Sequence, residues 1–63
     1  MMPFIELHNE YNGRPIYVNA CFISTVLSAD DQCTRINIVG EDASLTVKET
    51  VSDVMGLIAE VER

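Results

Sequence analysis

Residues 45–54 have the sequence Leu-Thr-Val-Lys-Glu-Thr-Val-Ser-Asp-Val, and in this stretch a two-residue period gives way to a helical one. Leu45 and Val47 alternate with polar neighbours, which is typical of a half-buried strand. Thr50 has a side-chain oxygen that can accept a hydrogen bond from a free amide in the first turn of a helix. Asp53 stands where a capping box carries its acid, and its negative charge suits the helix dipole. The stretch therefore predicts a strand followed by a helix whose cap is formed by Thr50 and Asp53.

After Thr50, apolar residues recur at the i, i+3, i+4 and i+7 spacing of one face of an α-helix. The residues on this face are Val51, Val54, Met55, Ile58 and Val61. Three acidic residues, Asp53, Glu60 and Glu62, fall elsewhere on the helix surface. We therefore expect the helix to pack with its apolar face on the sheet formed by the preceding chain.

The first two predicted strands form a hairpin around Asn12-Gly13. This dipeptide is a strong signal for a two-residue type I′ loop, which needs a positive φ at both positions. Such a loop pairs Asn9 with Ile16 and Leu7 with Val18. In that register one face collects the apolar residues Ile5, Leu7, Ile16 and Val18.

Two more strands are predicted between this hairpin and the opening stretch. Asn19 suits a turn or a short helical cap before a strand over 23–28. Ile23 and Val26 are three residues apart, so a bulge or a later strand start is needed to put both on one face. The next strand covers 34–39, and a four-residue loop at 40–43 would pair Ile38 with Leu45.

Together these segments predict an α+β fold in a single domain, 1–63. The expected architecture is a small, bent antiparallel β-meander of about five short strands, with one C-terminal helix packed on one face. A chain of this length buries only about 60% of its unfolded surface, so small domains often rely on disulfides, metals or partners.

Charge and composition exclude several classes of partner. Ten acidic residues face four scattered basic ones, giving a net charge of −6. Binding to the phosphate backbone needs clustered positive charge, so we expect no nucleic-acid partner. No segment approaches the roughly 18 apolar residues of a membrane span, so no membrane insertion is expected. Residues 1–6 lack the features of a leader peptide, and Cys21 and Cys33 are expected to be free thiols in the cytoplasm.

The few residues that could carry chemistry do not form a constellation. His8 is predicted on the face opposite the core, across from Tyr17, where a surface cross-strand pair is favoured over a proton shuttle or a ligand. His8, Cys21 and Cys33 lack the spacing of a zinc site. A nucleophilic site needs a Ser or Cys beside a base held by a third group. We therefore predict a protein that is not an enzyme, with no catalytic, cofactor-binding or metal-binding residues and no cofactor.

The pattern at 5–7, 12–20, 34–36 and 47–51 resembles the FlbD/SwrD family of small flagellar-operon proteins. The strongest segments are Asn-Gly-x-Pro followed by Val-Asn-Ala within 12–20, and Val-Lys-Glu-Thr-Val at 47–51. The resemblance implies an accessory role in flagellar motor function and carries over no catalytic residues. The strand order and the terminal helix also resemble the β-rich core of LytTR-type DNA-binding domains. A DNA-associated regulatory domain is therefore the alternative function.

The face opposite the predicted core is not cleanly polar. The large apolar residues expected on or near it are Phe4, Tyr17, Phe22, Leu27 and Val39. A contiguous patch of this kind usually marks an interface, and a symmetric homodimer is the commonest assembly. We therefore expect a non-enzymatic protein-interaction module that forms a homo-oligomer, a dimer or a multiple of one, with face-to-face contact through Leu27 and Val39.

Overall fold

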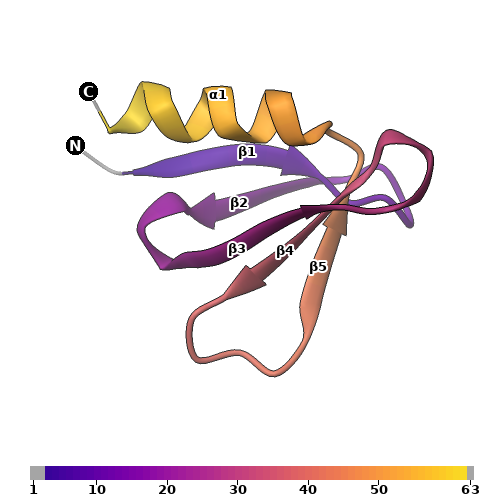
Figure 1. Cartoon of the computed structure of the whole chain (residues 1–63), viewed down its shortest axis with the longest axis horizontal. Coiled ribbons are helices and arrows are strands. Elements are labelled where there is room, and N and C mark those ends of the chain that lie inside the picture. The colour runs from indigo at the N-terminus through magenta and orange to yellow at the C-terminus, as the bar shows by residue number, and fades with distance from the viewer. Residues whose placement is uncertain (1–2, 63) are drawn as a thin grey trace.

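The computed structural model describes residues 3–62, with all of their side chains except that of Asp31. It contains five strands and one long helix, which confirms the predicted α+β class (Figure 1). The elements are β1 (Phe4–His8), β2 (Pro15–Asn19), β3 (Ile23–Ser28), β4 (Thr34–Ile38), β5 (Ser44–Val47) and α1 (Val51–Val61), with short 3-10 turns η1 (Ala20–Phe22) and η2 (Asp30–Gln32).

The strands form two antiparallel sheets, one made of β1 and β2 and the other of β3, β4 and β5. An isolated bridge between Asn9 and Val47 joins them where β1 ends. Beside this bridge the Lys48 amide donates to the His8 carbonyl at 2.8 Å. These contacts link the end of β1 to the end of β5, while the two sheets remain separate, and η1 connects β2 to β3.

The register of the first hairpin differs from the prediction by two residues. Leu7 faces Ile16 and Ile5 faces Val18. Because the shift is even, every side chain stays on its predicted face, and Ile5, Leu7 and Val18 are buried.

The connecting loop explains the shift. Asn9 pairs with Arg14, whose carbonyl accepts from the Asn9 amide at 2.9 Å, so four residues form the loop. Of those four, only Gly13 has a positive φ, at 73°. Asn12 instead accepts a hydrogen bond from the Arg14 amide through its side chain, at 2.9 Å. The type I′ prediction was therefore wrong.

The pairing of β4 with β5 shows the same kind of correction. Ile36 faces Leu45 and Thr34 faces Val47, again two residues from the predicted register. The loop between these strands is longer than four residues, and the apolar faces are preserved. In β3 the expected irregularity is a bulge between Ile23 and Thr25.

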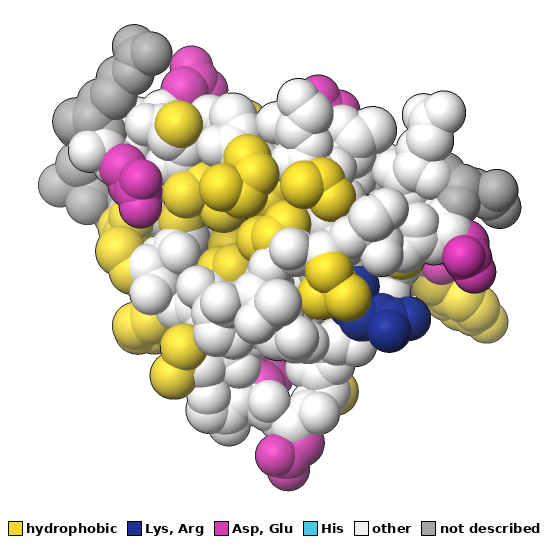
Figure 2. All heavy atoms as spheres, viewed as in Figure 1, with side chains coloured by type: hydrophobic (Ala, Val, Ile, Leu, Met, Phe, Trp, Pro, Cys, Tyr) yellow, Lys and Arg dark blue, Asp and Glu magenta, His cyan; other side chains and the backbone are white. Residues whose placement is uncertain are grey.

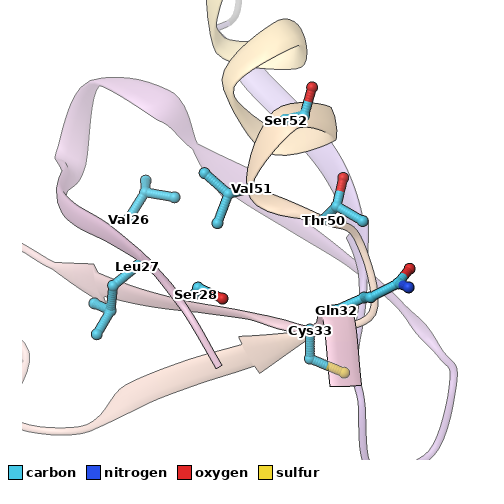
Figure 3. A pocket seen from close by; sticks show the side chains of 8 residues that line it. All are labelled: Val26, Leu27, Ser28, Gln32, Cys33, Thr50, Val51 and Ser52. Atoms are coloured by element: carbon cyan, nitrogen blue, oxygen red, sulfur yellow. The ribbon is translucent and has the colours of Figure 1, made fainter. Parts of the chain in front are cut away.

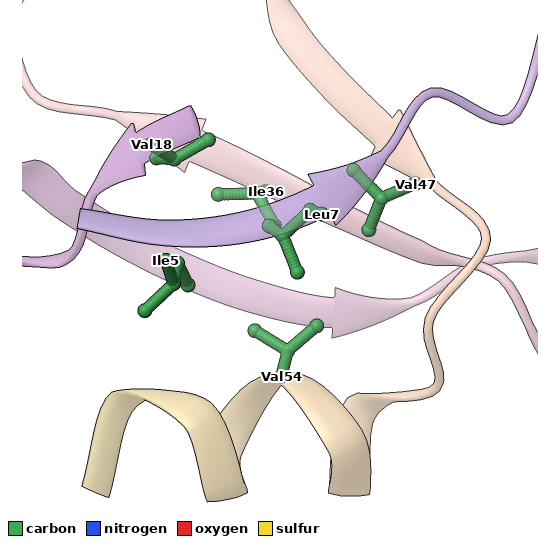
Figure 4. Close-up of a cluster of buried hydrophobic side chains, with 6 residues drawn as sticks. All are labelled: Ile5, Leu7, Val18, Ile36, Val47 and Val54. Atoms are coloured by element: carbon green, nitrogen blue, oxygen red, sulfur yellow. The ribbon is translucent and has the colours of Figure 1, made fainter. Parts of the chain in front are cut away.

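The core lies between the two sheets and α1 and is wholly aliphatic (Figure 4). Its buried apolar residues are Ile5, Leu7, Val18, Ile36, Val47 and Val54. Thr34 is buried beside them, and its hydroxyl donates to the Glu49 carbonyl at 2.6 Å. This bond fixes the chain between β5 and α1, so that α1 packs against β1 and β3.

Helix α1 begins after Thr50, whose hydroxyl accepts from the Asp53 amide at 3.1 Å. Val54 is the helix residue that is fully buried. Met55, which the periodicity places on the same face, is 49% exposed, whereas Leu57 packs against the core from outside the predicted stripe. The buried face of α1 is therefore rotated toward Leu57 relative to the prediction.

Candidate functional site

All four aromatic residues of the protein lie on its surface. Phe4, Tyr11, Tyr17 and Phe22 have exposed fractions of 44%, 93%, 62% and 57%. The chain contains no tryptophan, so its core has no aromatic ring at all. Aromatic side chains bury a large apolar area when covered, and they are enriched in protein interfaces. The exposed aromatic rings are the clearest functional signal on the molecule.

The five residues predicted to form a self-association surface are all exposed, but the structure arranges them in two groups. Phe4 faces Asn19 and Tyr17 faces Glu6, which makes Phe4 and Tyr17 diagonal neighbours on the β1–β2 sheet. The second group consists of Leu27 in β3, Phe22 in the η1 turn before β3, and Val39 directly after β4.

In this second group, Phe22 and Val39 are neighbours because the Val39 amide donates to the Phe22 carbonyl at 2.7 Å. Leu27 lies further along β3, opposite Arg35. Phe4 and Tyr17 thus belong to one sheet, and Phe22, Leu27 and Val39 belong to the other sheet or lie next to it.

Two exposed apolar residues were missed by the sequence analysis. Tyr11 lies at the tip of the β1–β2 loop, where its amide donates to the Asn9 side chain at 2.7 Å. Its position next to the Asn-Gly turn was the signal that could have revealed it, because a turn residue is seldom buried. Met55 was assigned to the buried stripe of α1, and only the actual rotation of the helix exposes it.

A shallow apolar groove runs between β3 and α1, and we call it the α1–β3 groove. One end, of about 450 Å³, is lined by Val26, Leu27 and Ser28 of β3 and by Val51 and Ser52 of α1 (Figure 3). The other end, of about 360 Å³, is more polar and is lined by Ile23 to Val26 together with Ala20, Met55, Ile58 and Glu62. Figure 2 shows apolar side chains gathered in the middle of this face, with acidic groups around its margin.

His8 does not form the predicted pair with Tyr17; in the sheet it faces Pro15. Its ring Nδ1 donates to Glu49 Oε2 at 2.6 Å, and its amide donates to Glu49 Oε1 at 2.9 Å. On the other side, His8 Nε2 lies 3.5 Å from Glu6 Oε2. The predicted pair with Tyr17 was wrong because the two-residue register shift places Pro15 opposite His8. The contact with Glu49 was not predicted because Glu49 is 41 residues away in the chain.

The environment of Glu49 changes its acidity. Burial raises the pKa of this carboxyl, but hydrogen bonds from the His8 ring and amide lower it, and the net pKa lies below the ordinary value. The His8–Glu49 pair therefore clamps the end of β1 to the segment that leads into α1. Among residues 3–62, the His8 ring contacts Glu49 and Glu6 and forms no hydrogen bond with a Ser or Cys side chain.

Within the described part of the chain, no three His, Cys, Asp or Glu side chains are placed to hold a metal ion. Cys21 is exposed and Cys33 is partly buried, and both are free thiols. None of the described helices has the length and apolar character needed to cross a membrane.

Comparison with known proteins finds no matching family model, no matching curated protein and no matching solved structure. The interpretation of the surface therefore rests on its own geometry.

Proposed function

We propose that this protein is a non-enzymatic, cytoplasmic protein-interaction module that associates with itself. The observation that supports this most strongly is the exposure of all four aromatic rings around a purely aliphatic core. A short chain gains stability when an oligomer covers apolar surface that the monomer leaves in water. The two groups of exposed apolar residues supply that surface.

The size of the molecule is compatible with a dimer. Its accessible surface is 4492 Å², whereas a stable interface of standard size takes about 800 Å² from each partner. Each copy would cover a modest share of its surface, leaving room for a further protein partner. The resemblance to the FlbD/SwrD family supports an accessory role in flagellar motor function for such a module.

Paired substitutions test this proposal. Leu27→Glu with Val39→Glu puts two charges on the β3–β4 group of exposed apolar residues. We expect the mass measured by light scattering to fall to that of the 7.0 kDa monomer, because a buried unpaired charge opposes association.

The matched control is Ala43→Glu with Ser44→Glu, which adds the same charge at exposed positions outside both apolar groups. It should keep the mass of the unmodified protein. Circular dichroism reports whether each variant is folded. An unchanged mass for folded Leu27→Glu/Val39→Glu would move the interface away from β3 and β4.

A further inference from the structure

Strand β3 is an edge of the three-stranded sheet. Within residues 3–62 it pairs with β4 alone, and β2 is an edge of the two-stranded sheet. An open edge presents unpaired backbone amides and carbonyls, which can pair with another strand. The two edge strands differ in how well the chain protects them.

Natural edge strands are usually protected by proline, charge or a bulge. Strand β2 begins with Pro15, which has no amide to donate. Strand β3 has the sequence Ile-Ser-Thr-Val-Leu-Ser, without proline and without charge. Its one protective feature is the bulge between Ile23 and Thr25, so the rest of the strand, from Thr25 to Ser28, is an unprotected edge.

The space beside β3 is also open. Every residue from Ile23 to Ser28 lines one end or the other of the α1–β3 groove, and Val26 lines both. The far wall is helix α1, where Met55 is 49% exposed. A strand laid along β3 would therefore find both free backbone groups and a wall that presents Val51, Met55 and Ile58 and has Glu62 at one end.

We propose that β3 pairs antiparallel with β3 of a second copy, joining two three-stranded sheets into one sheet of six. This rests on the proposed self-association and names its interface. A second copy fits because the strand is self-complementary under a two-fold axis, which is the commonest symmetry of homo-oligomers. It also fits because two chains of net charge −6 meet here along a segment free of charge.

Symmetry restricts the register. A two-fold axis perpendicular to the sheet maps each face of the sheet onto itself. Each residue must therefore lie opposite a residue of the other copy whose side chain is on the same face. Centring the axis on Val26 pairs residues 25–27 of the two copies and places Val26 opposite the Val26 of the other copy, while Ser28 falls opposite the bulge of the other copy. Thr25 then lies opposite the second copy's Leu27. Both α1 helices lie on the same side of the joined sheet, and each Met55 is covered beneath the seam.

Disulfide trapping tests this register. Val26→Cys is made in a Cys21→Ser/Cys33→Ser background, so that one thiol remains. Opposed Cβ atoms in an antiparallel pair lie about 4.5–5.5 Å apart, close to the distance that a disulfide spans. The control is Thr46→Cys, a residue equally half-buried in the same sheet, whose carbonyl already accepts from the Glu10 amide at 3.0 Å.

Under mild oxidation we expect about tenfold more covalent dimer from Val26→Cys than from the control, because only the Val26 thiols face each other. A dimeric mass without preferential trapping at Val26 overturns the β3 interface and leaves self-association standing. A monomeric mass without trapping overturns both.

Hydrogen exchange on the unmodified protein gives a second measurement. Amides of 23–28 that do not donate to β4 should exchange more slowly as concentration rises, and no such change contradicts the pairing.

Discussion

Individual side chains determine where α1 begins. Thr50 satisfies one of the free amides of the first turn through its hydroxyl, which accepts from the Asp53 amide. We predict that Thr50→Ala lowers the free energy of unfolding by about 1 kcal/mol, since the lost acceptor is not replaced. Urea denaturation measures this, with Ser52→Ala as the control on the same turn. Equal midpoints for the two variants would show that the cap contributes nothing.

The His8–Glu49 pair gives a second prediction at the residue scale. The pKa of Glu49 is lowered in the folded state, so its contribution to stability is present above the ordinary glutamate pKa of about 4.3. That contribution is lost as the pH falls through the lower folded pKa. We expect Glu49→Gln to be less stable than the unmodified protein at neutral pH and to lose less stability on acidification. Urea midpoints measured from neutral pH to about pH 3 test this, and parallel curves would contradict it.

Two glycines play different parts in their elements, Gly13 in the β1–β2 loop and Gly56 in helix α1. Gly13 has a φ of 73°, a left-handed conformation that costs a residue with Cβ about 1–2 kcal/mol. Gly56 lies in α1, and a Cβ added there would meet nothing within 4 Å. We therefore predict that Gly13→Ala destabilises the protein, whereas Gly56→Ala stabilises it by up to about 1 kcal/mol. Thermal melts of the two variants should shift in opposite directions; shifts of the same sign would show that one local argument is incorrect.

The strands also show which features of the fold could be predicted from the sequence. Alternation of apolar residues predicted which faces of β1, β2, β4 and β5 are buried, because a period of two depends only on local spacing. It could not distinguish registers that differ by two residues, since both keep Ile36 and Val47 inside. The longer loops decided between them, and their geometry depends on contacts such as that of the Asn12 side chain with the Arg14 amide.

For the candidate surface, local patterns could likewise predict which side chains point away from the core. Phe4 and Tyr17 are exposed, as their alternation with buried Ile5 and Val18 requires, and exposed Leu27 follows half-buried Val26. Their division between two sheets, the exposure of Met55 and the His8–Glu49 contact all depend on how distant segments meet. Local sequence patterns do not determine contacts between distant segments, so these features required the three-dimensional structure.

For the whole molecule, charge leads to a prediction about DNA. A net charge of −6 without a basic cluster offers few phosphate contacts. We expect no binding to duplex DNA tighter than the non-specific range of about 10⁻⁴–10⁻⁶ M at physiological salt. Fluorescence anisotropy with a labelled duplex measures this. Nanomolar binding would instead favour the DNA-associated regulatory function.

The central claim is that the open β3 edge and the exposed apolar residues beside it are covered in solution by a second copy. Static light scattering across a dilution series, from high to low micromolar protein, tests this most directly. We predict a mass of twice 7.0 kDa, or a multiple of that dimer, at the upper end of the series. A constant mass of 7.0 kDa throughout would contradict the account.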